Sequence, residues 1–385
     1  MGISHTAKNE KLKIAMLGHK RIPSREGGVE IVVEELSTRM SKQGHQVTCY
    51  NRRGHHVSGK QYDSERPSEY KGVRQKYAFT IEGKGIAAFT SSFFAVLKAS
   101  FGRYDIVHFH GEGCCFMAWL PRLFGKKCVV TIHGVDWQRE KWRGTFGARF
   151  IHFSERIAAR FADEIIVLSR SVQEYFLDSY GRETRFIPNG VSKMPSREPD
   201  LIRQKYGLKK DSYLLFVGRI VPEKGIRYLV DAFSHVKTDK KLIIAGGSSD
   251  TDAFMEEMIA LAKEDERIVF IGFVSGQLLE ELYSNAYLYV LPSNLEGMPL
   301  SLLEAMSSSN CCVISDIPEL TEVAQDHAVV FRTDDAIDLK DKLQMLCDDE
   351  ILVQRYKGTV SDYICGKYNW DDVIDQTLKL YRDLL

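Results

Sequence analysis

Short runs of Val, Ile and Leu alternate with longer amphipathic segments along most of the chain. Runs without polar alternation predict buried strands in the first half at residues 13–17, 47–50, 105–110, 129–133 and 164–168. The second half repeats the pattern at residues 213–217, 242–245, 268–271, 286–291, 312–315 and 328–331. Strands that are apolar on both faces are typical of parallel sheets covered by helices. The alternation therefore predicts an α/β protein with doubly wound, Rossmann-like sheets.

The sequence also indicates where one domain ends. Ile187-Pro-Asn-Gly190 closes the first unit, and the polar segment 192–199 (SKMPSREP) has the composition of a linker. We expect an N-terminal domain at 1–190, a C-terminal domain at 191–365, and a last helix at 366–385 that returns to the N-terminal domain. Other helices are predicted at 29–40, 226–233, 254–266 and 302–307. Two such domains face each other across a cleft, with ligands at the carboxyl ends of strands.

Composition narrows the classes of function. The 385 residues carry 52 Lys and Arg against 52 Asp and Glu, so we expect no polyelectrolyte partner such as nucleic acid. The chain lacks an apolar run of about 18 residues and an N-terminal signal, which predicts a cytoplasmic protein. Eight cysteines occur without a CxxC pair. Packed free thiols are favoured over disulfides or a zinc site.

A glycine-bearing loop opens the first helix. The loop runs from Gly18 to Gly28 and places Gly27 and Gly28 at the helix start. Free N–H groups there favour an anion such as phosphate. The spacing matches neither the dinucleotide fingerprint nor the P-loop, so a flexible turn without a ligand is the alternative.

Histidines stand at two strand ends in the first half. His108 and His110 share one face of a strand, and His133 ends another strand before Gly134, with Asp136 three residues further on. His108 and His110, with Asp136 as a third ligand, could bind zinc, but no carboxylate or cysteine lies at tight spacing to the histidines. We therefore predict that His133 projects into the cleft. Hydrogen-bonded structural roles are favoured for His108 and His110.

Two motifs in the second half offer chemistry at strand ends. Arg219 and Lys224 follow a strand that ends at Gly218, and two cations there suit a diphosphate, although solvated side chains are the alternative. Glu296 lies in a loop and Glu304 in the helix that follows. Ser301-Leu-Leu-Glu304 reads as a capping box, which would give Glu304 a purely structural role.

Two acidic patterns are discounted. Asp250-Thr-Asp252 matches a metal-binding DxD motif, but it lies in a polar loop where chance is the better account. Asp371-Asp372 is expected to begin a helix, where acidic residues interact favourably with the dipole.

The ordered set of motifs resembles the retaining glycosyltransferases of family 4, which have the GT-B fold. The resemblance extends over nearly the whole chain. The loop Arg21-Ile-Pro-Ser-Arg-Glu-Gly-Gly28 further resembles a branch with rhamnosyltransferases of bacterial capsule and surface-polysaccharide assembly. This resemblance implies catalytic roles for His133, Arg219, Lys224 and Glu296. It implies donor-binding roles for Gly27, Gly28, Phe273, Val274, Leu300, Ser301 and Glu304, and makes Asp136 and Asn189 acceptor-side candidates.

The implied reaction moves a sugar from a nucleoside diphosphate donor, such as dTDP-rhamnose or a UDP-hexose, to a glycan or polyprenyl-diphosphate-linked acceptor. Arg219 and Lys224 would neutralise the leaving diphosphate without a metal or cofactor. Glu304 would bind ribose, Glu296 the donor sugar, and His133 would lie beside the anomeric carbon. Retaining hydrolases use two carboxylates ~5–5.5 Å apart. The family instead implies front-face transfer, in which the leaving phosphate helps to deprotonate the acceptor.

Three features lie outside this common pattern. Met298 stands where the family often has phenylalanine, which would alter the sugar pocket. The polar gap Arg52–Tyr77 is expected to be a flexible acceptor loop. The apolar segment Phe89–Phe101 is accompanied by basic residues and predicts contact with the inner face of a membrane, with a core helix as the alternative. These basic residues are Lys98, Arg103, Arg139, Lys141, Arg143 and Arg149.

Two other classes of function stay open at this point. A nucleotide-sugar epimerase of the same fold would convert a donor in the absence of an acceptor. A sugar-nucleotide sensor would bind UDP or dTDP without hydrolysing or transferring anything.

Overall fold

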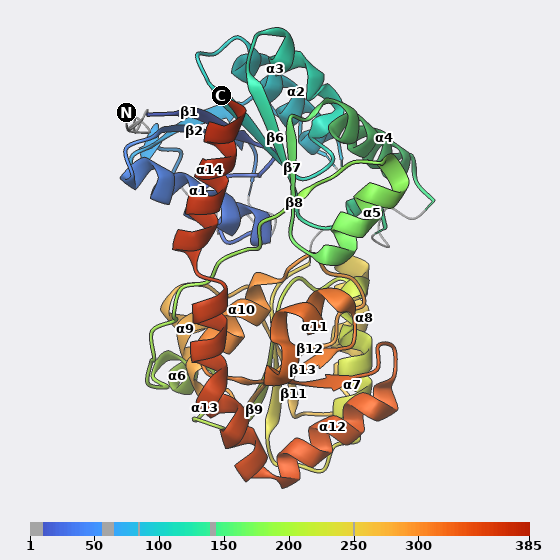
Figure 1. Cartoon of the computed structure of the whole chain (residues 1–385). Coiled ribbons are helices and arrows are strands. Elements are labelled where there is room, and N and C mark those ends of the chain that lie inside the picture. Colours follow the sequence, from blue (N-terminus) through green and yellow to red (C-terminus); the bar gives the residue numbers. More distant parts are fainter. Residues whose placement is uncertain (1–10, 56–64, 84, 139–143, 249–250) are drawn as a thin grey trace.

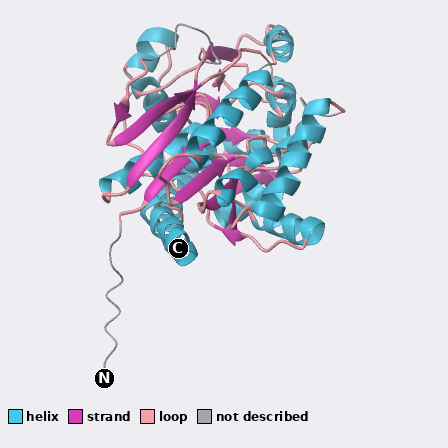
Figure 2. Ribbon diagram, turned by 90° about the horizontal axis from the view of Figure 1, so that it is seen from above, coloured by secondary structure: helices cyan, strands magenta, loops and turns pink. Residues whose placement is uncertain are grey.

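A computed structural model describes residues 11–55, 65–83, 85–138, 144–248 and 251–385. The chain forms two sheets, one above the other in Figure 1, and helices cover both faces of each sheet. Figure 2 looks down on the molecule and shows strands between layers of helices. Four residues named from the sequence lie outside the described residues: Arg139, Lys141, Arg143 and Asp250.

The first sheet has eight strands in the order β3-β4-β2-β1-β5-β6-β7-β8. All neighbours are parallel except the β3–β4 hairpin at one edge. Chain order reverses between β1 and β5, and the carboxyl ends of strands open a crevice at such a point. The strands are β1 Lys13–Leu17, β2 Gln46–Arg52, β3 Glu69–Tyr70, β4 Val73–Ala78, β5 Ile106–His110, β6 Lys127–Ile132, β7 Glu164–Val167 and β8 Arg185–Phe186.

The second sheet has six parallel strands in the order β11-β10-β9-β12-β13-β14. Its order reverses between β9 and β12, which makes a second crevice of the same kind. The strands are β9 Tyr213–Val217, β10 Lys241–Ala245, β11 Ile268–Gly272, β12 Leu288–Leu291, β13 Cys311–Ser315 and β14 Ala328–Phe331.

Helices connect the parallel strands, as crossover connections require. The first group is α1 Gly28–Lys42, α2 Ile86–Ser100, α3 Trp119–Leu123, α4 Phe146–Phe161, α5 Arg170–Tyr180 and α6 Leu201–Tyr206. The second group is α7 Ile226–Ser234, α8 Asp252–Ala262, α9 Gln277–Asn285, α10 Leu300–Ser307, α11 Pro318–Ala324, α12 Ala336–Asp348, α13 Glu350–Lys367 and α14 Trp370–Leu384. Short 3-10 turns are η2 Cys115–Met117, η3 Asp136–Gln138, η5 Pro222–Lys224 and η6 Gln325–His327.

The predicted fold class is confirmed, and each predicted strand occurs with ends within two residues of the expected ones. The prediction of a flexible loop at 52–77 is wrong where the chain is described. Strand β4 pairs with β2 there, and the buried Gln75 Oε1 accepts a hydrogen bond of 2.7 Å from Asn51 Nδ2. The strand was missed because its inward positions include this polar side chain. All eight cysteines are free thiols, and six of them are buried.

The C-terminal helix belongs to the first domain in space. Helix α13 lies along the second domain, and α14 then crosses to run beside α1 in Figure 1. Asn369 caps α14 by accepting a hydrogen bond from Asp372 N at 2.8 Å, which fits the predicted helix start at Asp371-Asp372. Arg39 of α1 pairs with Asp371 at 2.9 Å. The buried face of α14 completes the core beneath α1.

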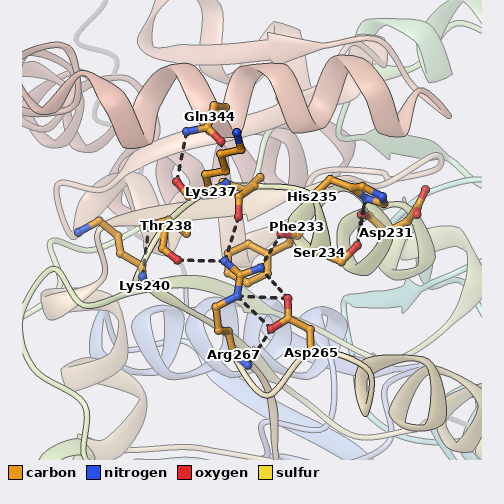
Figure 3. Close-up of polar contacts among 11 residues, drawn as sticks. Asp231, Phe233, Ser234, His235, Lys237, Thr238, Lys240, Asp265, Arg267 and Gln344 are labelled. Atoms are coloured by element: carbon orange, nitrogen blue, oxygen red, sulfur yellow. Dashed lines mark hydrogen bonds and ion pairs between the residues drawn. The ribbon is translucent and has the colours of Figure 1, made fainter.

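A cluster of polar contacts around Arg267 joins the loops before β10 and β11, at the amino-terminal edge of the second sheet (Figure 3). This edge lies away from the cleft. Arg267 contacts both oxygens of Asp265 and donates to the carbonyls of Val236 and Thr238 at 2.9 and 3.0 Å. Gln344 of α12 donates to the Lys237 carbonyl. The hydrogen bonds from Arg267 lower the pKa of Asp265. With its donors committed to this loop, Arg267 has a structural role.

The packing of α14 against the first domain can be tested by substituting Ile374, which is fully buried. We expect Ile374→Ala to lower the free energy of unfolding by about 2–5 kcal/mol, because it leaves a cavity. Asp375→Ala removes an exposed neighbour on the same helix and should change stability by less than about 0.5 kcal/mol. Urea unfolding of both variants measures this; equal losses would contradict the assigned packing.

Candidate active site

Two glycines allow the domains to touch at the floor of the cleft. A Cβ on Gly297 would lie 2.0 Å from the His133 carbonyl oxygen, and one on Gly134 would lie 3.4 Å from Gly297 N. The loop after β6 and the loop after β12 therefore meet backbone to backbone. This contact brings His133 of one domain beside Glu296 of the other.

Two helix N-termini face each other beside this contact. Gly28 begins α1, and a Cβ there would lie 3.8 Å from Leu300 Cδ1 at the start of α10. Neither helix has a side-chain cap, and the hydrogen bonds of α10 begin only with Leu302 and Leu303. The amides of Leu300 and Ser301 therefore point out of the helix end. Two such ends provide N–H donors and positive dipole ends for an anion.

Lys224 and Glu296 form an ion pair at the carboxyl end of the second sheet. Each side chain is only 10% exposed, and Ser293 Oγ donates to the same Glu296 oxygen at 2.7 Å. Gly225 has a φ of 65°, and a Cβ there would lie 1.9 Å from the Pro292 carbonyl oxygen. This close approach seats the Lys224 turn directly against the Glu296 loop.

Arg219 lies at the same edge of the sheet, one residue after Gly218. The strand ends are joined here, since Gly218 N donates to Ala245 O and Gly246 N donates to Gly272 O. A Cβ on Gly246 would lie 1.7 Å from Gly218 O. Phe273 and Val274 come directly after β11. The predicted base-binding segment therefore lies at the carboxyl end of β11, with β10 between it and β9, which Arg219 follows.

Glu304 does not close a capping box. Pro299 is the N-cap of α10 and Ser301 is already its second residue, so Glu304 lies one turn into the helix. Its carboxylate instead receives a hydrogen bond of 3.3 Å from Tyr283 and lies 3.5 Å from Arg25 Nη1 of the other domain. Burial raises the pKa of Glu304, and Arg25 and Tyr283 counteract that shift.

Arg25 was not predicted as a site residue, although it lies in the quoted motif. Its loop is held from within by Glu26, which is buried and pairs with Lys20 at 3.6 Å and Arg21 at 2.9 Å. Glu30 of α1 accepts from Lys20 N at 2.8 Å. The acids of this loop are therefore committed to the loop itself, and the cation Arg25 projects across the cleft.

A row of histidines leads from the C-terminal helix to the cleft. Tyr381 of α14 contacts His108 Nδ1 at 2.5 Å, and Thr131 contacts its Nε2 at 2.7 Å. His110 Nδ1 lies 3.2 Å from His133 Nε2. Burial lowers the pKa of His108 to about 3 and also lowers that of His110, so both are neutral. The predicted structural roles fit these contacts. Among described residues, no group of three His, Cys, Asp or Glu is arranged to bind a metal.

Two acceptor-side candidates differ in placement. Asp136 begins the turn that follows His133 and Gly134, and its backbone N donates to the buried Glu112 at 3.1 Å. Asn189 is buried and donates through Nδ2 to the Met298 carbonyl at 3.0 Å. Its side chain thus joins the domains, and an acceptor-side role for Asn189 stays a prediction. Sequence could not show this, because Met298 lies on the other domain.

Two sequence profiles match this chain, one for each half. The profile described as Glycosyltransferase Family 4 matches residues 26–193, and that described as Glycosyl transferases group 1 matches residues 199–359. An uncharacterized glycosyltransferase of Methanocaldococcus jannaschii is 25% identical over 96% of this chain and 98% of its own length. The chain is a glycosyltransferase of the family 4 type.

Other relatives of this glycosyltransferase support the same family assignment. O-antigen chain mannosyltransferase B of Escherichia coli is 29% identical over 47% of this chain and 48% of its own length. The structure of Anabaena HepE in complex with UDP-glucose matches with a TM-score of 0.80 at 16% identity, covering 97% of this chain and 100% of that one. This likeness concerns the fold. The prediction of a family 4 type glycosyltransferase is confirmed, while the retaining mode and the rhamnosyltransferase branch stay predictions.

No helix in the described part of this glycosyltransferase is long and apolar enough to cross a membrane.

The domain contact can be tested with Gly297→Ala. The added Cβ collides with the His133 carbonyl, so we expect the domains to separate and the glycosyltransferase activity to fall about tenfold or more, as misplacement of reacting groups does. Gly358→Ala adds a methyl group in open space on α13 and serves as the control. Activity and small-angle scattering measure both effects; a compact, fully active Gly297→Ala variant would contradict the contact.

Proposed function

We propose that this enzyme transfers a sugar with retention from a nucleoside diphosphate donor to a glycan or polyprenyl-diphosphate-linked acceptor, in the assembly of a bacterial surface polysaccharide. One observation carries the proposal. The helix N-termini at Gly28 and Leu300 face each other next to the cations at the end of β9, and the carboxylate of Glu304 lies one helical turn away. This set matches a nucleoside diphosphate in charge and in order.

The diphosphate is the group that must be stabilised as the glycosidic bond breaks. Negative charge builds on it, and fixed donors in a closed cleft stabilise such charge without reorganisation. Lys224 is held in place by Glu296, and Arg219 lies in the same connection between β9 and α7. The amides at Gly28 and Leu300–Ser301 would complete the cradle, so the chemistry needs no metal ion.

The ribose and the base extend from this cradle into the second domain. Glu304 can accept hydrogen bonds from two ribose hydroxyls, and in the structure the Arg25 guanidinium occupies that side of its carboxylate. A donor would therefore replace Arg25 at Glu304. The base would lie along Phe273 and Val274 after β11.

The contacts of Glu296 support front-face transfer over a double displacement. Its charge is paired with Lys224 and hydrogen-bonded by Ser293, which makes it a poor nucleophile. The same pairing aims it at the hydroxyls of a donor sugar. His133 lies across the domain contact from Glu296, where its ring can face the anomeric carbon.

Donor specificity rests on fewer residues than the sequence indicates. Met298 is buried, and its Sδ and carbonyl receive hydrogen bonds from Asn189. Its side chain therefore contributes to the joint between domains and does not define the sugar pocket. The choice of dTDP-rhamnose or a UDP-hexose would depend on contacts to single hydroxyls near Glu296 and His133. Rhamnose is favoured by the resemblance of the Arg21–Gly28 loop.

Arg219→Ala and Lys224→Met should each lower turnover with little change in melting temperature. Losing one leaving-group cation costs about 2–4 kcal/mol of transition-state stabilisation. Arg227→Ala removes an exposed cation that pairs with Glu257 on the outer face of the same domain, and it should leave turnover unchanged. Single-turnover kinetics with UDP- and dTDP-sugars measure this. Near-normal rates in both cleft variants would refute the cradle.

Glu304→Gln should weaken UDP or dTDP binding by roughly 1–3 kcal/mol, because an amide has one acceptor oxygen where the carboxylate has two. Glu322→Gln is the matched control: Glu322 pairs with Arg170 across the domain boundary at 3.4 Å, much as Glu304 pairs with Arg25. Calorimetric titration compares the affinities. If both variants bind nucleotide as the wild type does, Glu304 is not the ribose ligand.

A membrane surface is the proposed location of the acceptor. Helix α2 packs its small residues inward, among them Ser92, Ala95 and Ala99, and leaves Phe89 and Phe101 exposed. Phe146 at the start of α4 is 81% exposed. Helices α2, α3 and α4 lie together on one side of the first domain in Figure 1. Exposed basic residues on α2 and α4 are Lys98, Arg149, Arg156 and Arg160. Exposed aromatic groups beside cations suit anionic lipid.

We expect the wild type to float with liposomes that contain anionic lipid and not with neutral ones. Phe101→Ser combined with Phe146→Ser should abolish flotation, since both rings are lost from the surface. Ile351→Ser, which removes an 85% exposed residue from α13 on the other domain, should have no effect. Absence of flotation for the wild type on either lipid would end the proposal.

A further inference from the structure

Two glutamates are buried directly behind the turn that follows His133. Glu112 follows β5 and Glu155 lies within α4, and both are fully buried. Within the described residues, neither carboxyl is paired with Lys or Arg. Burying a carboxylate without a cationic partner costs free energy. Two such carboxyl groups side by side therefore need hydrogen-bond donors or a proton between them.

Glu155 has three donors. Trp137 Nε1 donates to its Oε2 at 3.2 Å, Tyr175 donates to its Oε1 at 2.7 Å, and the Tyr180 hydroxyl donates to Oε1 as well. Hydrogen bonds of this number favour the charged form of a carboxyl group. Both Glu155 oxygens therefore act as hydrogen-bond acceptors.

Glu112 has a different environment. Its Oε2 accepts from Asp136 N at 3.1 Å, and its buried Oε1 receives no donor. Glu112 and Glu155 bind adjacent residues of the same turn, Asp136 and Trp137, which brings the two buried side chains together. Burial, and then the charges of Asp136 and Glu155, raise the pKa of Glu112 well above its usual range. A proton on Glu112 resolves the contact, because a neutral acid can donate to Glu155 while its other oxygen still accepts from Asp136.

We propose that Glu112 and Glu155 share one proton and act together as positioning residues for the turn Asp136–Gln138, which forms the acceptor side of the cleft. The assignment of this turn to the acceptor side rests on the proposed function. The Glu112–Glu155 pair and its hydrogen bonds to the turn do not depend on it. Glu112 fixes the backbone of Asp136, and Glu155 fixes the ring of Trp137, which also stacks on His152 at 5.0 Å between ring centroids. The shared proton couples the two anchors, so neither can move without the other.

The full-length chain can be tested without knowing the acceptor. The variants are Glu112→Gln, which keeps one acceptor and one donor, and Glu112→Met, which keeps neither. Glu281→Gln and Glu281→Met are the matched controls, since Glu281 is fully buried in the other domain and accepts from Ile202 N at 3.1 Å. Infrared spectroscopy detects the carbonyl stretch of a buried protonated carboxylic acid. Hydrogen exchange reports on the Asp136 amide.

The wild type should show a protonated-acid band at neutral pH. Glu112→Gln should lose this band yet keep the slow exchange of Asp136, because the amide restores both contacts. Glu112→Met should lose the band and accelerate exchange at Asp136 about tenfold or more. The Glu281 variants should keep the band, and in Glu281→Met faster exchange should be confined to the neighbourhood of Ile202.

Several outcomes would overturn the pair. A band that persists in Glu112→Gln shows that Glu112 is not the protonated group. Exchange at Asp136 as fast in Glu112→Gln as in Glu112→Met shows that the proton does not hold the turn. If Glu112→Met does not fold, the Glu112→Gln comparison decides alone.

Titration with UDP separates the two proposals. Wild type and Glu112→Met should bind UDP with affinities within about twofold of each other, because the pair lies away from the donor cradle. A large loss in Glu112→Met would place the pair on the donor side and refute its assignment to the acceptor side. If the wild type itself does not bind UDP or dTDP, the donor proposal fails, while the infrared band and the exchange rates still decide the pair.

Discussion

The contact between Gly134 and Gly297 is the constraint on which the site depends. Each domain alone presents an open row of strand ends, and neither row contains both a cation cradle and a histidine. The two loops can meet only because neither has a side chain at the point of contact. Once they meet, His133 and Glu296 become neighbours, and the ends of α1 and α10 face each other. The chemistry of the cleft is therefore a property of the closed pair of domains.

Three cations at the cleft are paired with acids before any ligand arrives. Lys224 lies on Glu296, Arg25 on Glu304, and Arg21 on Glu26. A free cation on a loop would be flexible and strongly hydrated. When a diphosphate binds, such a cation would lose conformational freedom and part of its hydration shell. Pairing removes part of that loss in advance.

Much of the fold could be predicted because apolar strand runs report burial locally. Site residues were predictable where they stand at strand ends, as Arg219 and His133 do. The remainder depends on partners far away in sequence. Glu304 looked like part of a capping box because Ser301 precedes it at the right spacing, and only the position of Pro299 shows where α10 begins. The hydrogen bond from Asn189 to Met298 could not be predicted, because the two residues belong to different domains. Glu112 drew no attention, since a lone glutamate says nothing of Glu155.

The return of α14 to the first domain has a consequence for biosynthesis. The first domain lacks part of its core, and the hydroxyl that contacts His108, until Tyr381 has been made. During translation, the surface that α14 will cover stays exposed while the entire second domain is synthesised. The first domain thus has to wait for the second, in contrast to the usual order in which domains fold as they emerge. Maturation of the histidine row is thereby linked to completion of the chain, and a ribosome that stalls before α14 yields a cleft without its support.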